Sequence, residues 1–295
     1  MIRRLLNVGI KRLKRLRERL TVVRFLVPSR PFSRILRPSI PVVVSMTSYP
    51  ARIENAWLSI ESLLRQSVSP KHLLLVLAED EFPDRVLPKR ICQQQKRGLD
   101  VMWTEKTAGS YDKLLPPLQE FPGLPIITCD DDKFFPRTLL KQLYTASLAN
   151  PKTVVGARGW KIRLNNQTLE YGVGWTRAER GASGHALLLP GGNGCLYPPG
   201  SLHESVLDTV SALAKAPTAD DLWFWGALMK RHTPMYCLGL PPHRPVRKQA
   251  NTPALAHRND SANGPQFQSV LKHFEIDLVD LLLEADTSPK PELEA

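Results

Sequence analysis

The chain has 295 residues, of which 42% are hydrophobic and 23% are charged. These proportions are typical of globular proteins, so they exclude a wholly disordered or fibrous chain. The longest uninterrupted apolar run, residues 73 to 78, is far shorter than the roughly 20 residues of a membrane-spanning helix, which excludes a multi-span membrane protein.

The formal net charge of +12 is carried almost entirely by the first 37 residues. They contain twelve Arg or Lys residues and one acid, Glu18, whereas the rest of the chain has 28 basic and 27 acidic residues. Any prediction of an anionic partner therefore concerns this N-terminal arm, and the near-neutral remainder argues against a protein that grips nucleic acid.

The arm has the pattern of an amphipathic helix. Apolar residues recur every three or four positions between residues 1 and 27, with arginines and lysines around them. Such a helix can lie on an anionic membrane surface, whereas a solvated arm, a partner-bound helix or a nucleic-acid contact are the alternatives. Prolines 28 and 31 end it, and a linker follows to residue 38. Four scattered cysteines and no secretory leader pattern predict a cytoplasmic protein, peripheral at the inner face of the plasma membrane.

From residue 39 onward, strand patterns alternate with helix patterns. Strands are predicted at 41–46, 73–78, 99–104, 124–129, 153–164 and 186–189. Helices are predicted at 54–66, from about Pro136, and at 202–216, 220–231 and 267–285. This alternation predicts an α/β fold with a mainly parallel sheet flanked by helices, whose ligand site lies at the carboxyl ends of the strands. Residues 39–286 then form one domain, between the arm at 1–38 and a flexible tail at 287–295.

An acidic triplet, Asp130, Asp131 and Asp132, follows the fourth predicted strand. If strand geometry continues, Asp130 and Asp132 point to one side and Asp131 to the other. Two carboxylates on one side suit a hard divalent ion, Mg²⁺ or Mn²⁺. The alternative is an acidic turn that caps the helix near Pro136, but the position at the ligand-binding edge of a parallel sheet favours a site.

Four segments of the sequence carry a family resemblance: VSMTSYPAR at 44–52, SYDKL at 110–114, IITCDDD at 126–132 with FFP shortly after, and GGNGCLYPP at 191–199. Together they resemble bacterial glycosyltransferases of the GT-A type, a Rossmann-related fold. The resemblance covers about residues 40 to 260, and the triplet is similar to the D-x-D motif of that family. It implies a nucleotide-sugar donor, a metal ion held by Asp130 and Asp132, and His257 as a further metal ligand. A surface histidine is the alternative for His257.

The loop after the first strand holds the nucleotide in that family. The resemblance therefore implies that Thr47, Ser48, Tyr49 and Arg52 contact the base, ribose or diphosphate of the donor, and their hydroxyls, aromatic ring and cation suit this. The alternative is a turn set by Pro50, in which the hydroxyls cap the next helix.

Further donor contacts are predicted elsewhere in the chain. They are Lys113, Asp130, Asp131 and Gly192. A solvated side chain is the alternative for Lys113. At Gly192, a glycine cluster permits close approach of the backbone to a sugar.

A second acidic pair, Asp220 and Asp221, begins a predicted helix. It resembles the acidic motif that inverting GT-A enzymes use as a general base toward the acceptor, with Asp221 the favoured residue. A helix N-terminus stabilises a carboxylate, whereas burial beside the following aromatic residues raises its pKa. The alternative role for either residue is a helix cap.

These observations predict a metal-assisted hexosyltransferase-like enzyme that moves a sugar from a nucleotide-sugar donor to a glycan or lipid-linked acceptor, as in cell-surface polysaccharide synthesis. Two alternatives remain open. A metal-dependent nuclease or other phosphoryl-transfer enzyme would also use clustered aspartates, and a non-catalytic sugar-nucleotide-binding adaptor could share the fold.

Overall fold

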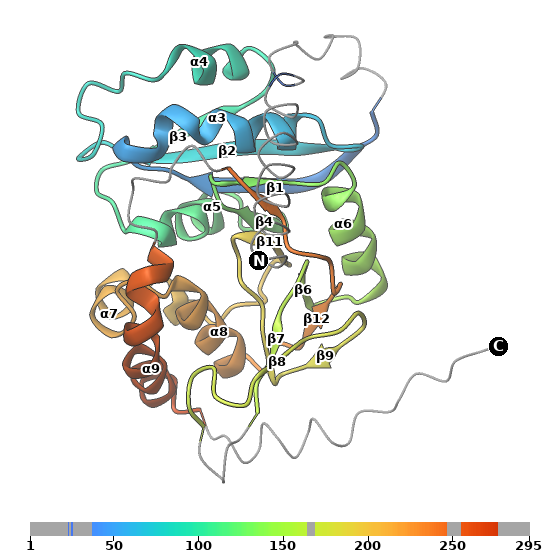
Figure 1. Cartoon of the computed structure of the whole chain (residues 1–295), viewed down its shortest axis with the longest axis vertical. Helices are drawn as coiled ribbons and strands as arrows, with labels where there is room; N and C mark the ends of the chain where they lie inside the picture. Colours follow the sequence, from blue (N-terminus) through green and yellow to red (C-terminus); the bar gives the residue numbers. More distant parts are fainter. Residues whose placement is uncertain (1–22, 24, 26–36, 164–168, 247–254, 277–295) are drawn as a thin grey trace, which may run out of the picture.

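The computed structural model of the chain describes residues 23, 25, 37–163, 169–246 and 255–276. Apart from residues 23 and 25, the predicted N-terminal helix lies outside these residues, as does the C-terminal tail. Within the described part, no helix has the length and apolar character needed to cross a bilayer. Figure 1 shows a central sheet with helices on both sides, which confirms the predicted α/β architecture.

The sheet has eight strands in the order β3-β2-β1-β4-β11-β6-β12-β9. Its first four strands are parallel and coincide with the predicted ones. They are β1 (Ser39–Thr47), β2 (Ser69–Ala78), β3 (Asp100–Thr104) and β4 (Ile126–Cys129). The central strands β1 and β4 are buried on both faces, which explains their continuous apolar sequences.

The other half of the sheet mixes directions. Strand β11 (Asn193–Tyr197) is antiparallel to both β4 and β6 (Val154–Gly156), whereas β12 (Met235–Cys237) runs parallel to β6 and antiparallel to β9 (Ser183–Gly184). The glycine cluster therefore leads directly into a strand that lies beside β4. Its short, glycine-containing sequence gave no strand signal.

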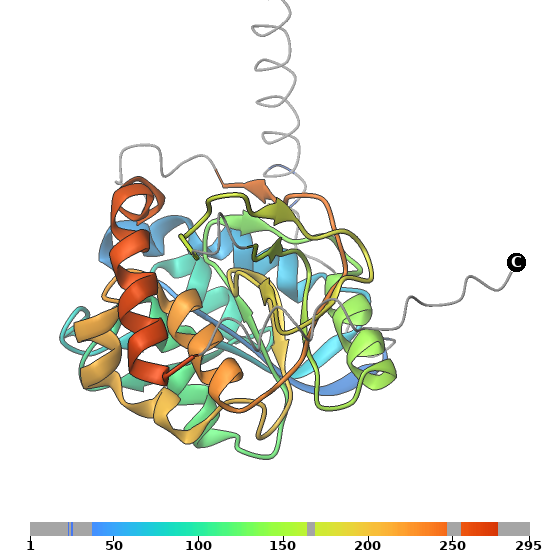
Figure 2. The same ribbon diagram turned by 90° about the horizontal axis from the view of Figure 1, so that it is seen from below.

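Helices cover both faces of the sheet, and each face has its own hydrophobic core. Helices α3 (Pro50–Leu64), α4 (Lys89–Gln95) and α6 (Leu139–Ala149) pack on one face, against Val42 and Val44 of β1. The opposite face, which includes Val43, is covered by the helices of the other core (Figure 2). These are η1 (Gly109–Lys113), α5 (Leu115–Glu120), α7 (Thr209–Lys215), α8 (Asp220–Lys230) and α9 (Leu255–Phe274).

Several predicted boundaries are wrong. The predicted strand 153–164 is divided into β6 and β7 (Trp160–Lys161), and β7 belongs to a separate small sheet with β10 (Leu187–Leu188) and β8 (Thr176–Arg177). The chain is closely packed at this break, because a Cβ atom on Gly159 would lie 2.6 Å from a side-chain carbon of Leu189. The predicted helix 202–216 is likewise divided, into η2 (Glu204–Leu207) and α7, and Asp208 caps α7 through the Ser211 N–H.

Two predicted helix starts are also wrong. Helix α6 begins at Leu139 rather than near Pro136, because the preceding segment is extended and its N–H groups bond to α3: Lys133 N–H to Ser59 Oγ, and Phe135 N–H to Ser62 Oγ. Helix α9 begins at Leu255, twelve residues before the predicted start, and includes Pro265. The periodic apolar residues from Phe267 to Phe274 pack on the aromatic residues of α8.

Candidate active site

The acidic triplet lies where the carboxyl ends of β1 and β4 meet. The two strands are parallel neighbours, with Ser45 beside Thr128, so the loops that follow them lie together. Asp131 is 4% exposed and accepts a 2.6 Å hydrogen bond from Ser48 Oγ in the loop after β1. This contact places the triplet at the edge of the sheet where α/β proteins bind their ligands.

Asp130 is held between two lysines. Its Oδ1 lies 3.0 Å from Lys113 Nζ and its Oδ2 lies 2.6 Å from Lys133 Nζ. Burial alone would raise the pKa of Asp130, but the two ammonium groups outweigh it and hold the pKa well below its usual range. Lys133 was not predicted as a site residue. It lies in β5 (Lys133–Phe134), and its place three residues after Asp130 was the available signal.

The other two acids of the triplet share one arginine. Arg52 Nη2 lies 3.2 Å from Asp131 Oδ1 and 2.6 Å from Asp132 Oδ2. Burial raises the pKa of Asp131 to about 6, although Arg52 and the Ser48 hydroxyl oppose the rise. The expected strand alternation is therefore wrong: β4 ends at Cys129, and the chain turns so that Asp131 and Asp132, rather than Asp130 and Asp132, share a partner.

The second acidic pair lies in the first turn of α8 and joins the same cluster. Lys113 Nζ lies 3.0 Å from Asp220 Oδ2 as well as from Asp130, so one buried ammonium links the two acidic segments. Neither Asp220 nor Asp221 occupies the N-cap position, which belongs to Ala219.

Asp221 has the ionisation expected of a proton acceptor. Its Oδ1 accepts a 2.8 Å hydrogen bond from the Gly191 N–H. Burial, followed by the charge of Asp220, raises the pKa of Asp221 to about 7, while Lys113 and the Gly191 N–H oppose the rise. A carboxyl group with this pKa exchanges its proton near neutral pH.

The glycine turn packs against both acidic groups. A Cβ atom on Gly192 would lie 1.8 Å from Asp130 Oδ2, and one on Gly191 would lie 3.3 Å from Asp221 Oδ1. The Asp130 N–H also donates to the Gly192 carbonyl at 3.2 Å. Close backbone approach was predicted toward a sugar, whereas the structure places the Asp130 carboxylate against Gly192.

Three further predicted site residues are Thr47, Tyr49 and His257. The Thr47 hydroxyl donates to the Val76 carbonyl of β2, so it is engaged within the sheet. Tyr49 is the N-cap residue of α3, and its ring lies 5.9 Å from the Arg52 guanidinium carbon. None of the described side chains caps this helix, so the alternative in which hydroxyls cap it is wrong. His257 lies near the start of α9, and its side chain is outside the described part of the structure.

The donor atoms fit a divalent ion bound by few protein ligands. Asp132 Oδ1 is buried and has no hydrogen-bond partner among the described residues, whereas both oxygens of Asp130 face lysines. Among the described side chains, no group of three or more His, Cys, Asp or Glu residues could hold a metal. Mg²⁺ and similar ions often bind only one or two carboxylates and complete their shell with water and substrate phosphates. Asp132 could supply one such carboxylate.

Comparison with known proteins gives a remote likeness. No family model and no curated protein matches the chain. A crystal structure of S. aureus TarS residues 1–349 is similar with a TM-score of 0.47 and 13% identity, over 82% of this chain and 74% of that one. TarS in complex with UDP-GlcNAc has a TM-score of 0.47 and 12% identity, over 80% and 72% of the two chains. At these values the likeness assigns no function, which therefore depends on the site.

Proposed function

We propose that this chain is a glycosyltransferase that uses a nucleotide-sugar donor. The observation that carries the proposal is the convergence of five aspartates with Lys113, Lys133 and Arg52 at the ligand-binding edge of the sheet. Such a cluster combines cations that can bind a diphosphate with a carboxyl group whose pKa is near 7. The four segments that resemble GT-A enzymes include most of these residues.

The donor side would use the basic residues and Asp132. Arg52 and Lys113 are fixed by their aspartate partners, so a diphosphate would meet cations already in place. If all five aspartates are ionised, the three cations leave a formal excess of two negative charges, which accommodates a divalent ion. Mn²⁺ or Mg²⁺ on Asp132, with Asp130 and the undescribed His257 side chain as further candidate ligands, would neutralise the leaving diphosphate.

The acceptor side would use Asp221. In a transfer with inversion, the acceptor oxygen forms the bond to the anomeric carbon while the bond to the diphosphate oxygen breaks, and the diphosphate leaves with the electron pair. The acceptor hydroxyl proton passes to Asp221, whose orientation is set by the Gly191 N–H. With retention of configuration, Asp221 has no such role.

The acceptor and setting follow from sequence features. A glycan or lipid-linked acceptor at the inner face of a bacterial plasma membrane, in cell-surface polysaccharide synthesis, is supported by the charge of the arm at residues 1–27. Deleting these residues should move the protein from the membrane to the soluble fraction of lysed cells. Unchanged fractionation would contradict this setting.

The enzymatic proposal is tested by screening UDP-, GDP- and CMP-sugars with Mn²⁺ and measuring nucleoside diphosphate or monophosphate release. We expect turnover with one donor and a loss of at least 100-fold in Asp132→Asn. Calorimetric binding without turnover would favour an adaptor. Cleavage of DNA that survives removal of residues 1–37 would favour a nuclease.

A further inference from the structure

The small sheet β10-β7-β8 lies next to the candidate active site. In its middle strand, Trp160 pairs with Leu188 of β10 on one side and with Arg177 of β8 on the other. Leu188 comes three residues before Gly191, whose N–H donates to Asp221. Because three residues span at most about 11 Å, this sheet begins close to the proposed proton acceptor.

Trp160 is the most exposed aromatic side chain among the described residues, at 41%. Side chains of directly opposite residues in an antiparallel pair lie on the same face of a sheet, so Trp160 and Arg177 share one surface. An exposed indole suits the apolar C–H face of a sugar ring, because contact removes both surfaces from water. Trp160 is therefore a candidate contact for a saccharide near Asp221.

A second arginine lies beside Arg177. Nη2 of Arg177 donates to the Leu240 carbonyl at 2.9 Å, and the Leu240 N–H donates to the carbonyl of Ala157, the residue before Arg158, at 2.8 Å. Burial, followed by the charge of Arg177, lowers the pKa of Arg158 from its ordinary value. Both guanidinium groups stay charged at neutral pH, so a bound anion would relieve their repulsion.

The neighbouring acid does not supply this anion. Glu179 follows Arg177 by two residues, but its carboxylate pairs with Lys161. Among the described groups whose charges shift the pKa of Arg158, none is a carboxylate. Within the described part of the chain, the two arginines therefore form a surface that complements an anionic ligand.

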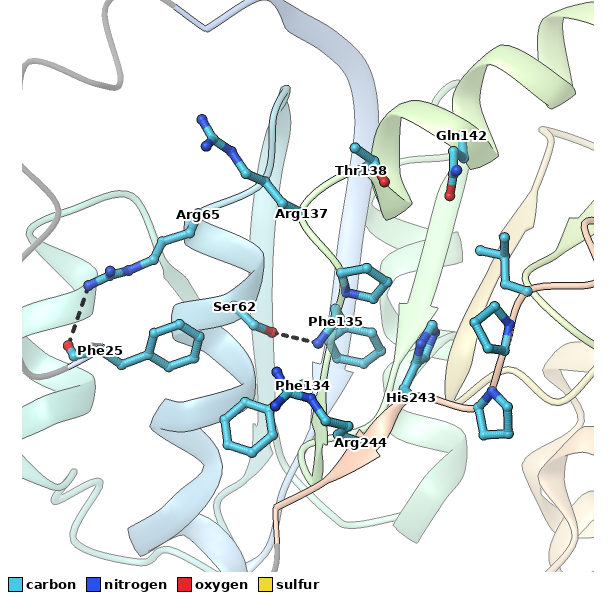
Figure 3. Close-up of a pocket in the computed structure, with 14 residues that line it drawn as sticks. Phe25, Ser62, Arg65, Phe134, Phe135, Arg137, Thr138, Gln142, His243 and Arg244 are labelled. Carbon is cyan, nitrogen blue, oxygen red and sulfur yellow. Dashed lines mark hydrogen bonds between the residues drawn. The ribbon is translucent and has the colours of Figure 1, made fainter. Parts of the chain in front are cut away.

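His243 lies near charged groups of this surface and of the aspartate cluster. Its ring packs against that of Phe135 (Figure 3). Burial lowers the pKa of His243, and the charges of Lys133 and Arg158 lower it further, so both cations are near this ring. Lys133 also holds Asp130, at 2.6 Å. Arg158 is therefore on the side of the molecule that carries the aspartates.

We propose that Arg158, Trp160 and Arg177 form an acceptor subsite for a sugar that carries a phosphate group. Two arginines match the charge of a phosphate monoester, about −1.5 to −2 at pH 7, and each planar guanidinium can bind two of its oxygens. A carboxylate carries only one negative charge and matches the pair less well. The assignment to the acceptor rests on the proposed function, in which Arg52 and Lys113 receive the donor diphosphate.

The test is a titration of the full chain, labelled with ¹⁵N-tryptophan, with methyl α-D-glucopyranoside 6-phosphate. The indole resonance of Trp160, identified by its loss in Trp160→Phe, should shift and saturate. This local signal separates the subsite from phosphate bound to the basic arm, which contains no tryptophan.

Arginine variants then test the phosphate contact. Arg158→Gln with Arg177→Gln should weaken the affinity at least about 10-fold, since charge-assisted hydrogen bonds are lost. Arg158→Gln alone, which keeps the bond from Arg177 to Leu240, should weaken it at least about 3-fold. A control that removes two charges elsewhere, Lys96→Gln with Lys215→Gln, should leave it within about 2-fold. All three variants should keep the wild-type Tm.

Comparison ligands separate the two parts of the subsite. Methyl α-D-glucopyranoside, which lacks the phosphate, and inorganic phosphate, which lacks the ring, should each bind at least about 10-fold more weakly. Equal affinity for either, equal losses in the arginine and control variants, or an unchanged Trp160 resonance would each overturn the proposal.

A last arm separates this subsite from the donor site. Saturating UDP, GDP or CMP with Mn²⁺ should leave the sugar phosphate bound at Trp160, whereas its displacement by any of them would place it in the donor site and overturn the proposal. Absence of turnover with every donor would count against the proposed transferase, but the titration would still decide whether the subsite exists.

Discussion

Lys113 Nζ lies 3.0 Å from Asp220 Oδ2, and both side chains are less than a tenth exposed. The same ammonium lies 3.0 Å from Asp130 Oδ1, so this lysine joins the end of β4 to the start of α8. Burial would lower the pKa of Lys113, but the three nearby aspartates raise it well above its usual value. The lysine therefore stays charged at neutral pH and fixes the geometry of the cluster.

Replacing this lysine should destabilise the protein. Lys113→Met leaves Asp220 without its buried counter-charge, and removing one partner of a buried ion pair typically costs about 3–5 kcal/mol. We expect the unfolding free energy from urea titration at pH 7 to fall by about 3 kcal/mol. The exposed Lys215→Met should change it by less than about 0.5 kcal/mol. Equal effects of the two substitutions would show that the buried link has no special role.

The raised pKa of Asp221 predicts a pH dependence of activity. A carboxyl group accepts a proton only when ionised, so kcat/KM should rise with pH through a midpoint near 7. Asp221→Asn should lower kcat by at least about 100-fold and remove this midpoint. A variant that keeps both the rate and the midpoint would exclude Asp221 as the base.

Gly192 should tolerate no side chain. An alanine Cβ would lie 1.8 Å from Asp130 Oδ2, so Gly192→Ala must displace a carboxylate that two lysines hold. We expect kcat/KM to fall by about 10-fold or more, since small displacements of positioned groups are costly. Gly123→Ala is the matched control, because its Cβ would meet nothing within 4 Å. Similar activity of both variants would contradict the packing role.

Asp112 predicts a pH dependence of stability. This side chain is 4% exposed, and burial raises its pKa to about 6, although the Ala108 N–H and the Thr107 hydroxyl oppose the rise. A raised carboxyl pKa contributes stability that is fully present below the unfolded value near 3.8 and is lost as pH rises through about 6. Between pH 4 and 7 the loss is on the order of 2 kcal/mol.

The variant Asp112→Asn should lack this loss. The difference in unfolding free energy between variant and wild type should therefore shift in favour of the variant by on the order of 2 kcal/mol from pH 4 to pH 7. Urea titrations at the two pH values measure it. A difference that stays constant with pH would mean that Asp112 titrates at its ordinary value in the folded protein.

The parallel half of the fold was predictable because three of its four strands, β1, β2 and β4, contain buried apolar runs, whereas β3 lies at the edge of the sheet. Continuous apolar runs of this length are typical of strands buried inside a parallel sheet, as β1, β2 and β4 are. Their order along the chain places the aspartates at one edge of that sheet. The sequence could not predict β11, whose place between β4 and β6 depends on pairing with strands distant in sequence.

The site was predictable in its residue types and less so in its pairings. Acids at the end of β4 and at the start of α8 are visible in the sequence, and both joined the cluster. Their partners were not visible, because Lys113 reaches Asp220 across more than a hundred residues and Arg52 crosses from α3 to the triplet. Strand alternation also failed at the one position where the chain leaves the sheet, between Cys129 and Asp131.

The central claim is that the aspartates at the end of β4 and the start of α8 bind an activated sugar through its diphosphate. A crystal structure with Mn²⁺ and the donor identified by screening, recorded at a wavelength where manganese scatters anomalously, tests it most directly. We predict an anomalous peak at Asp132 Oδ1, with the diphosphate near Arg52 and Lys113 and the anomeric carbon facing Asp221. Donor bound elsewhere on the molecule, with the contacts of Asp132 unchanged, would contradict the claim.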